Sequence, residues 1–163
     1  MFLDYIYQIQ IFILAKKGMF FIMQEIEILK EISKDSKMGM DSITMVNKKV
    51  QDEKFKKLLN TQHDEYQNIF DRTQELLVQH DKKIEDVPTM QKMMGWVGIQ
   101  MNTMNDKSNS QLSELLIQGN DMGVIKGTKL LNSSNFTTPE IENLLSDFVR
   151  LQEKNIDDLK KFL

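Results

Sequence analysis

Apolar residues recur at helical spacing over most of the chain. From Gln24 onward they fall three or four positions apart, which places them on one face of a helix, and polar residues fill the positions between them. The pattern is continuous over 24–49, 52–81, about 99–131 and 139–162. The sequence therefore predicts four long helices, each with a single apolar stripe.

The predicted stripes hold small and polar residues as well as apolar ones. The first contains Ile28, Ile32, Gly39, Ile43 and Val46, with Asp35 and Ser36 at the missing step. The second contains Phe55, Leu58, Leu59, Gln62, Tyr66, Ile69, Thr73, Leu76 and Leu77. The third contains Met101, Met104, Leu112, Leu115, Ile117 and Met122. The fourth contains Ile141, Leu144, Leu145, Phe148, Leu151, Asn155, Leu159 and Phe162.

Sequence signals at the ends of these stretches support the same division. Asp52 is a suitable N-cap for the second helix, and Thr138 followed by Pro139 is typical of a helix start. Thr137 and Glu140 have the spacing of a capping box. Residues 132–135 predict a turn.

Four amphipathic helices can bury their stripes only against one another, so the predicted fold is an all-α four-helix bundle. Two connections are possible between the second and third helices. If 88–131 forms one helix, the bundle is a simple up-down-up-down arrangement. If Gly95 and Gly98 interrupt it beside Trp96, residues 82–98 cross the length of the bundle, as in ferritin-like proteins. We favour the crossover, with 82–87 as a loop, Pro88 at a helix start and a short helix over 89–96.

Residues 1–22 differ in composition from the rest of the chain, being aromatic, apolar and nearly uncharged. The alternation over 5–13 has the period of a strand, although a lone strand would have no partner in a helical protein. We expect 1–22 to be an extension or a translated leader upstream of a start at Met23, and 23–163 to be the single domain. A membrane-associating arm is the alternative interpretation.

The composition and motifs of the chain exclude several kinds of metal-binding and catalytic site. The chain has no Cys and two His, which excludes thiolate metal sites and disulfides. Its 21 basic and 24 acidic residues give a net charge of −3, so we expect no nucleic-acid partner. Phosphate-binding glycine loops and nucleophile-elbow motifs are absent from the sequence. We interpret the 12 Met as core filler.

Several short strings resemble a small, largely uncharacterised family of bacterial ferritin-like proteins. They are 37–40 (KMGM), 50–53 (VQDE), 90–104 (MQKMMGWVGIQMNTM), 106–108 (DKS), 114–119 (ELLIQG) and 122–123 (MG). The resemblance covers nearly all of 24–163 and none of 1–22. It implies a ferritin-like fold and no established activity.

A ferritin-type di-metal site needs a Glu on each of two helices and Glu-x-x-His on each of the other two. Here the corresponding pairs are Gln62-x-x-Glu65 and Gln152-x-x-Asn155, without His. The candidate layer, which we interpret as a vestigial site forming a polar layer in the core, is Asp35, Gln62, Glu65, Tyr66, Glu114, Gln152 and Asn155. We expect no metal and no other cofactor. The alternative is a metal-binding or oxidoreductase bundle that uses the three carboxylates.

Two features of the third helix carry further expectations. Gly119, Gly123 and Gly127 are spaced by four and predict a close helix contact, either between subunits or within the bundle. The polar residues between 102 and 111 are interpreted as an exposed face of a continuous helix, with Ser108 in the core.

Together these features predict a non-enzymatic, cytoplasmic bundle that acts by contact with a protein partner or by forming a homo-oligomer. We expect no membrane partner.

Overall fold

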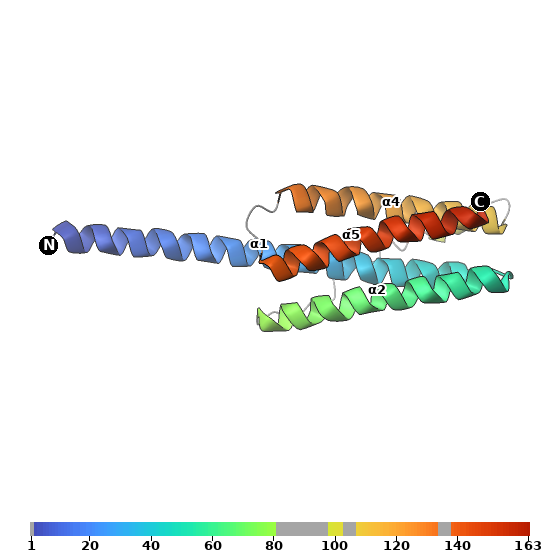
Figure 1. The fold of residues 1–163 in the computed structure, drawn as a ribbon, viewed down its shortest axis with the longest axis horizontal. Helices are drawn as coiled ribbons and strands as arrows, with labels where there is room; N and C mark the ends of the chain where they lie inside the picture. Colours follow the sequence, from blue (N-terminus) through green and yellow to red (C-terminus); the bar gives the residue numbers. More distant parts are fainter. Residues whose placement is uncertain (1, 81–97, 103–106, 134–137) are drawn as a thin grey trace.

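A computed structural model describes residues 2–80, 98–102, 107–133 and 138–163, and it shows a bundle of long helices (Figure 1). The main elements are α1 (Phe2–Asn47), α2 (Glu53–Gln79), α4 (Asn109–Ser133), α5 (Pro139–Leu159) and the short 3₁₀ helix η1 (Lys160–Phe162). Residues 98–102 are also helical, and no strand occurs in the described part of the chain.

The helices form two antiparallel pairs, α1 with α2 and α4 with α5, which pack on each other through α2–α5 and α1–α4 contacts (Figure 1). Side-chain pairs confirm the direction of α1 and α2. Gln74 donates to Ser33 at 3.0 Å near one end, and Asn47 donates to Asn60 at 2.9 Å near the other. The predicted four-helix bundle is therefore confirmed.

The starts of α2 and α4 lie at the same end of the bundle. Phe55, in the first turn of α2, stacks on Phe162 with ring centroids 4.4 Å apart. Ser113, in the first turns of α4, donates to the carbonyl of Leu159 at 2.6 Å. The two helices therefore run in the same direction, which is the arrangement of a ferritin-like bundle, and the simple up-down-up-down alternative is wrong. The predicted loop at 82–87, Pro88 and helix 89–96 lie outside the described residues.

The predicted stripes form one hydrophobic core. Phe55, Leu59, Ile141 and Leu145 are among the fully buried side chains. The prediction for Met122 is wrong, because its side chain is 54% exposed on the outer side of α4. Met104 lies outside the described residues.

Helix starts follow the capping signals in part. Asp52 caps α2 by accepting a hydrogen bond from the Phe55 amide at 2.8 Å. Thr138 precedes Pro139 as predicted, but its side chain makes no capping bond. Its amide instead donates to the carboxylate of Glu25 at 2.7 Å, which joins α1 to the start of α5. Thr137 lies outside the described residues.

The continuous helix predicted over 99–131 is wrong. Residues 107 and 108 are not helical, and α4 begins at Asn109. Ser108 caps it, accepting from the Gln111 amide at 3.4 Å through its hydroxyl and from the Leu112 amide at 3.0 Å through its carbonyl. Asn and Ser side chains compete for backbone hydrogen bonds, which is why this polar stretch starts a helix instead of continuing one.

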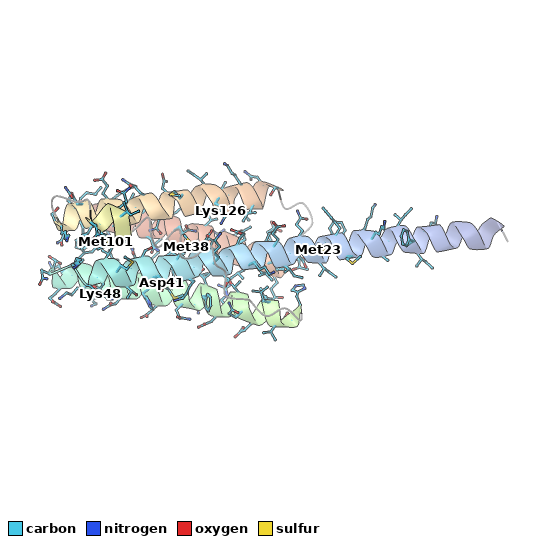
Figure 2. All side chains as sticks on the ribbon, turned by 180° about the vertical axis from the view of Figure 1, so that it is seen from behind. Met23, Met38, Asp41, Lys48, Met101 and Lys126 are labelled. Atoms are coloured by element: carbon cyan, nitrogen blue, oxygen red, sulfur yellow. The ribbon has the colours of Figure 1, made fainter. Side chains whose placement is uncertain are left out.

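The strand-like alternation over 5–13 does not produce a strand. Residues from Phe2 onward continue α1 as helix, which satisfies the backbone groups within the segment. The first half of α1 projects beyond the other helices, and Met23 lies near the point where it leaves them (Figures 1 and 2). Side chains over 10–20 are all exposed, including Phe12 at 60% and Phe20 at 63%. Within the described residues, no helix is long and apolar enough to cross a membrane.

Candidate functional site

Four of the seven candidate residues meet in the core as a polar layer, which a fifth residue completes. Gln62, Tyr66, Gln152 and Asn155 are each at most 4% exposed. The fifth, Asn120 of α4, is 7% exposed and was missed by the sequence analysis. Its signal was the spacing Leu112, Leu116, Asn120, but it stands between Gly119 and Asp121 and looks like a polar surface residue.

Tyr66 crosses the bundle and touches every long helix. Its ring lies against Gly39 of α1 and meets Phe148 of α5 edge-on, with centroids 6.4 Å apart. Its hydroxyl donates to Oδ1 of Asn120 on α4 at 2.8 Å. Burial raises the pKa of Tyr66 well above its usual value, so the phenol stays protonated and acts as a donor.

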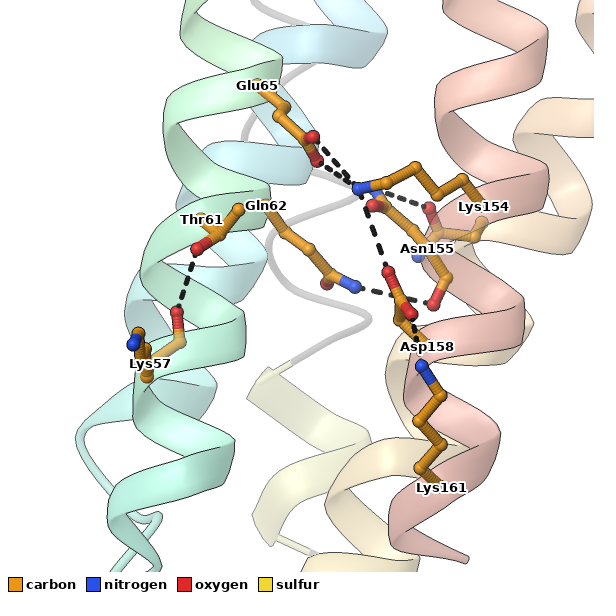
Figure 3. A network of polar contacts seen from close by, with 9 residues as sticks. Lys57, Thr61, Gln62, Glu65, Lys154, Asn155, Asp158 and Lys161 are labelled. Atoms are coloured by element: carbon orange, nitrogen blue, oxygen red, sulfur yellow. Dashed lines mark hydrogen bonds and ion pairs between the residues drawn. The ribbon is translucent and has the colours of Figure 1, made fainter.

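The amides around Tyr66 are bonded to one another and to the backbone. Nδ2 of Asn155 donates to Oδ1 of Asn120 at 3.4 Å, and Nε2 of Gln62 donates to the carbonyl of Asn155 at 3.3 Å (Figure 3). Nε2 of Gln152 donates to the carbonyl of Phe148 at 3.3 Å. The layer links three helices by hydrogen bonds, while Oδ1 of Asn155 is buried without a partner among the described residues.

Glycines provide the space that these larger side chains occupy. A Cβ at Gly39 would lie 2.8 Å from the Tyr66 ring, and one at Gly123 would lie 1.5 Å from Oε1 of Gln152. A Cβ at Gly127 would lie 2.5 Å from Val149. Gly123 and Gly127 thus serve packing of α4 on α5. Gly119 differs, because a Cβ there would meet nothing within 4 Å.

Asp35 lies outside this layer, in the interface of α1 and α4. Its carboxylate pairs with Lys126 at 2.9 Å, and Lys126 also pairs with Glu31. Burial raises the pKa of Asp35, and the neighbouring ammonium group opposes that rise. Burial alone would lower the pKa of Lys126, but its hydrogen bonds with Glu31 and Asp35 outweigh burial and raise it.

Glu65 lies on the opposite side of the bundle, in the interface of α2 and α5. Lys154 binds its carboxylate at 2.9 Å and approaches Asp158 at 3.6 Å (Figure 3). The hydrogen bond to Glu65 raises the pKa of Lys154, and the hydrogen bond from Lys161 lowers that of Asp158. The side chains of this network are partly exposed, so polar contacts extend from the core layer to the surface of the bundle.

Glu114 is exposed on α4 and accepts a hydrogen bond from Gln118 at 3.4 Å. The three candidate carboxylates are therefore on separate parts of the bundle: one in the α1–α4 interface, one in the α2–α5 interface and one on the outer surface. They do not converge on a common centre.

The residues of the layer do not fit a ferritin-type metal centre. Such a centre is built from carboxylates and imidazoles, whereas this layer offers amides and a protonated phenol, which are weak ligands for iron or manganese. His63 is turned toward the surface beside Asp64, and His80 lies at the end of α2 near Glu25. The described residues contain no group of three or more His, Asp or Glu able to hold a metal ion.

Two solved structures resemble this fold. One is a DUF305 fragment from Deinococcus radiodurans, with a TM-score of 0.67 and 16% identity over 85% of this chain and 93% of that one. The other is a dodecameric thioferritin, the bacterioferritin-related protein from Bacteroides fragilis, with a TM-score of 0.69 and 8% identity over 86% of this chain and 84% of that one. No family model and no curated protein matches the sequence.

Identities this low show the fold alone. The chain has a ferritin-like helical fold, and the layer of Tyr66, Asn120 and Asn155 lies in its core.

Proposed function

We propose that this protein is a non-enzymatic ferritin-like bundle that acts through self-association, with no metal chemistry in its core. The observation that carries the proposal is the composition of the polar layer. Amides and the Tyr66 hydroxyl bond to one another across three helices, and the carboxylates that a metal would need are paired elsewhere with Lys126 and Lys154. We therefore expect the surface of the bundle to carry the function.

Within the domain that we propose to begin at Met23, the outer side of α4 is the surface that best supports self-association. In the described part of the chain after Met23, large exposed apolar side chains are Val78, Ile99, Met122, Ile125 and Leu163. Among these, Met122 and Ile125 are neighbours one turn apart on a helix, with exposed fractions of 54% and 52%. Gly119 precedes them on the same side and would let another helix approach closely.

The oligomeric state tests this proposal directly. Light scattering coupled to size exclusion should give a mass above that of one chain, and the double variant Met122→Lys with Ile125→Lys should elute as a monomer. Asn143→Lys, which adds charge at an exposed position on α5, is the control and should leave the mass unchanged. A wild-type protein that is monomeric at all accessible concentrations would contradict self-association.

The metal content of the purified protein tests the second part of the proposal, that the core carries no metal chemistry. After incubation with iron, manganese and calcium, we expect the purified protein to retain no stoichiometric metal. About two transition-metal ions per chain would instead support the alternative of a metal-binding or oxidoreductase bundle.

We further propose that 23–163 is the functional domain and that 1–22 lies outside it. We also propose that the protein belongs to the small bacterial family that its motifs resemble and that it works in the cytoplasm. The absence of buried side chains over residues 10–20 supports the domain boundary. Mass spectrometry of the translated N-terminus tests the domain boundary. Fractionation of expressing cells tests the location.

A further inference from the structure

A second polar site lies on the outer side of the α1–α2 pair, away from the core layer. It is a cavity of about 410 Å³ between the last turns of α1 and the first turns of α2. Lys48, which lines it, stands near the end of the bundle opposite to the projecting half of α1 (Figure 2). The volume falls within the range of about 300–1,000 Å³ that is usual for small-molecule sites.

The charged side chains that line the cavity are those of Lys48 and Lys56, and none of its described lining residues is Asp or Glu. Glu53 and Asp64 lie beside this wall, 2.9 Å from Lys56 and 3.7 Å from His63, so Glu53 offsets part of its positive charge. Lys48 forms no ion pair with any described residue. Lys56 pairs at 2.9 Å with Glu53, whose side chain is 84% exposed, so a ligand could replace or share this partner at little cost.

The same wall contains two amide side chains, Asn47 and Asn60, and one of their polar atoms has no hydrogen-bond partner among the described residues. Nδ2 of Asn47 donates to Oδ1 of Asn60 at 2.9 Å, while Oδ1 of Asn47 is buried and has no partner among the described residues. With Nδ2 used for Asn60, the unpartnered atom of Asn47 is an acceptor. A ligand that brings a hydrogen-bond donor could satisfy it.

We propose that this cavity binds a molecule that carries a phosphate group. The ammonium groups of Lys48 and Lys56 would hold the phosphate oxygens, and Oδ1 of Asn47 would accept a hydrogen bond from a hydroxyl of the ligand. Lysine binds phosphate as a point charge, and the described lining residues include no arginine, whose planar fork suits bidentate binding of carboxylate or phosphate. The cavity is larger than a phosphate ion, and Ile43 in its floor offers an apolar contact for an organic group.

The test is a titration of the ¹⁵N-labelled full chain, followed by NMR, with inorganic phosphate and with phenyl phosphate at constant ionic strength. We expect saturable shifts of the Asn47 and Asn60 amide signals and of residues around Lys48. Saturation by both probes shows that the phosphate group suffices, and saturation by phenyl phosphate alone shows that the organic part contributes. Either result supports the site.

Two variants and a control make the result specific. Lys48→Gln removes one charge, and Asn60→Asp adds a repelling carboxylate while keeping the acceptor for Asn47. Each should raise the dissociation constant at least about tenfold. Lys129→Gln, an exposed lysine on α4, should leave it unchanged. Shifts that grow linearly without saturation, or that persist in both variants, would overturn the proposal, and the spectrum itself shows whether each variant is folded.

Discussion

The ring of Tyr66 on α2 lies directly against Gly39 on α1, where a Cβ would come within 2.8 Å of the ring carbons. The Tyr66 ring therefore fits in this position only because residue 39 has no side chain, and Tyr66 in turn belongs to the polar layer of the core. Its hydroxyl reaches Asn120 on the far side of the bundle. This pair sets how closely α1 and α2 approach at the level of the polar layer.

Gly39→Ala is expected to destabilise the protein by about 1–3 kcal/mol, because the added methyl group forces the Tyr66 ring out of a closely packed position. Chemical denaturation of the variant measures the loss. Gly18→Ala, on the same helix, is the control, since a Cβ there meets nothing within 4 Å, and it should be neutral or stabilising. Equal effects of the two substitutions would show that the Gly39 contact does not matter.

Tyr66→Phe is expected to cost about 1–3 kcal/mol, because it removes the donor to Asn120 and leaves that buried oxygen with only the longer bond from Asn155. The ring and its packing on Gly39 are kept, so the effect isolates the hydroxyl. Equilibrium unfolding monitored by circular dichroism gives the value. A loss below a few tenths of a kcal/mol would mean that the layer is not held by this bond.

Asp35 should make the stability depend on pH with a defined sign. Burial raises its pKa in the folded protein above the ordinary value of 3.8, so ionising it costs more in the folded than in the unfolded state. Its contribution is greatest below pH 3.8 and is lost as the pH rises through the folded pKa. The free energy of unfolding of the wild type minus that of Asp35→Asn should thus fall between pH 3 and neutral pH. Glu27→Gln, at an exposed position on α1, provides the reference, and a difference that rises with pH would contradict this assignment.

Removing residues 1–22 is expected to leave the midpoint of thermal unfolding nearly unchanged, because the side chains over 10–20 are exposed and bury nothing. Glu25→Ala should lower the midpoint, since Glu25 is 5% exposed and accepts the Thr138 amide. Differential scanning calorimetry of both proteins provides the comparison. A large drop on truncation would show that the first half of α1 belongs to the cooperative unit.

Part of the candidate site could be predicted because burial follows the helical period. Gln62, Tyr66, Gln152 and Asn155 stand at stripe positions, and all of them are buried. Glu65 and Glu114 were assigned to the same layer, but they lie off the stripe, where a lysine partner or solvent satisfies them. Asn120 was missed because neither its residue type nor its neighbours suggest burial.

The sequence by itself determined that four helices form and most of their buried positions, because both depend on spacing within about four residues. It did not place the start of α1 at Phe2 or of α4 at Asn109. Only the tertiary structure decided that Tyr66 meets Asn120, that Gly123 faces Gln152 and that Met122 is exposed. These relationships depend on how far each helix is shifted and rotated relative to its neighbours. No local pattern encodes the distance between residues 54 positions apart.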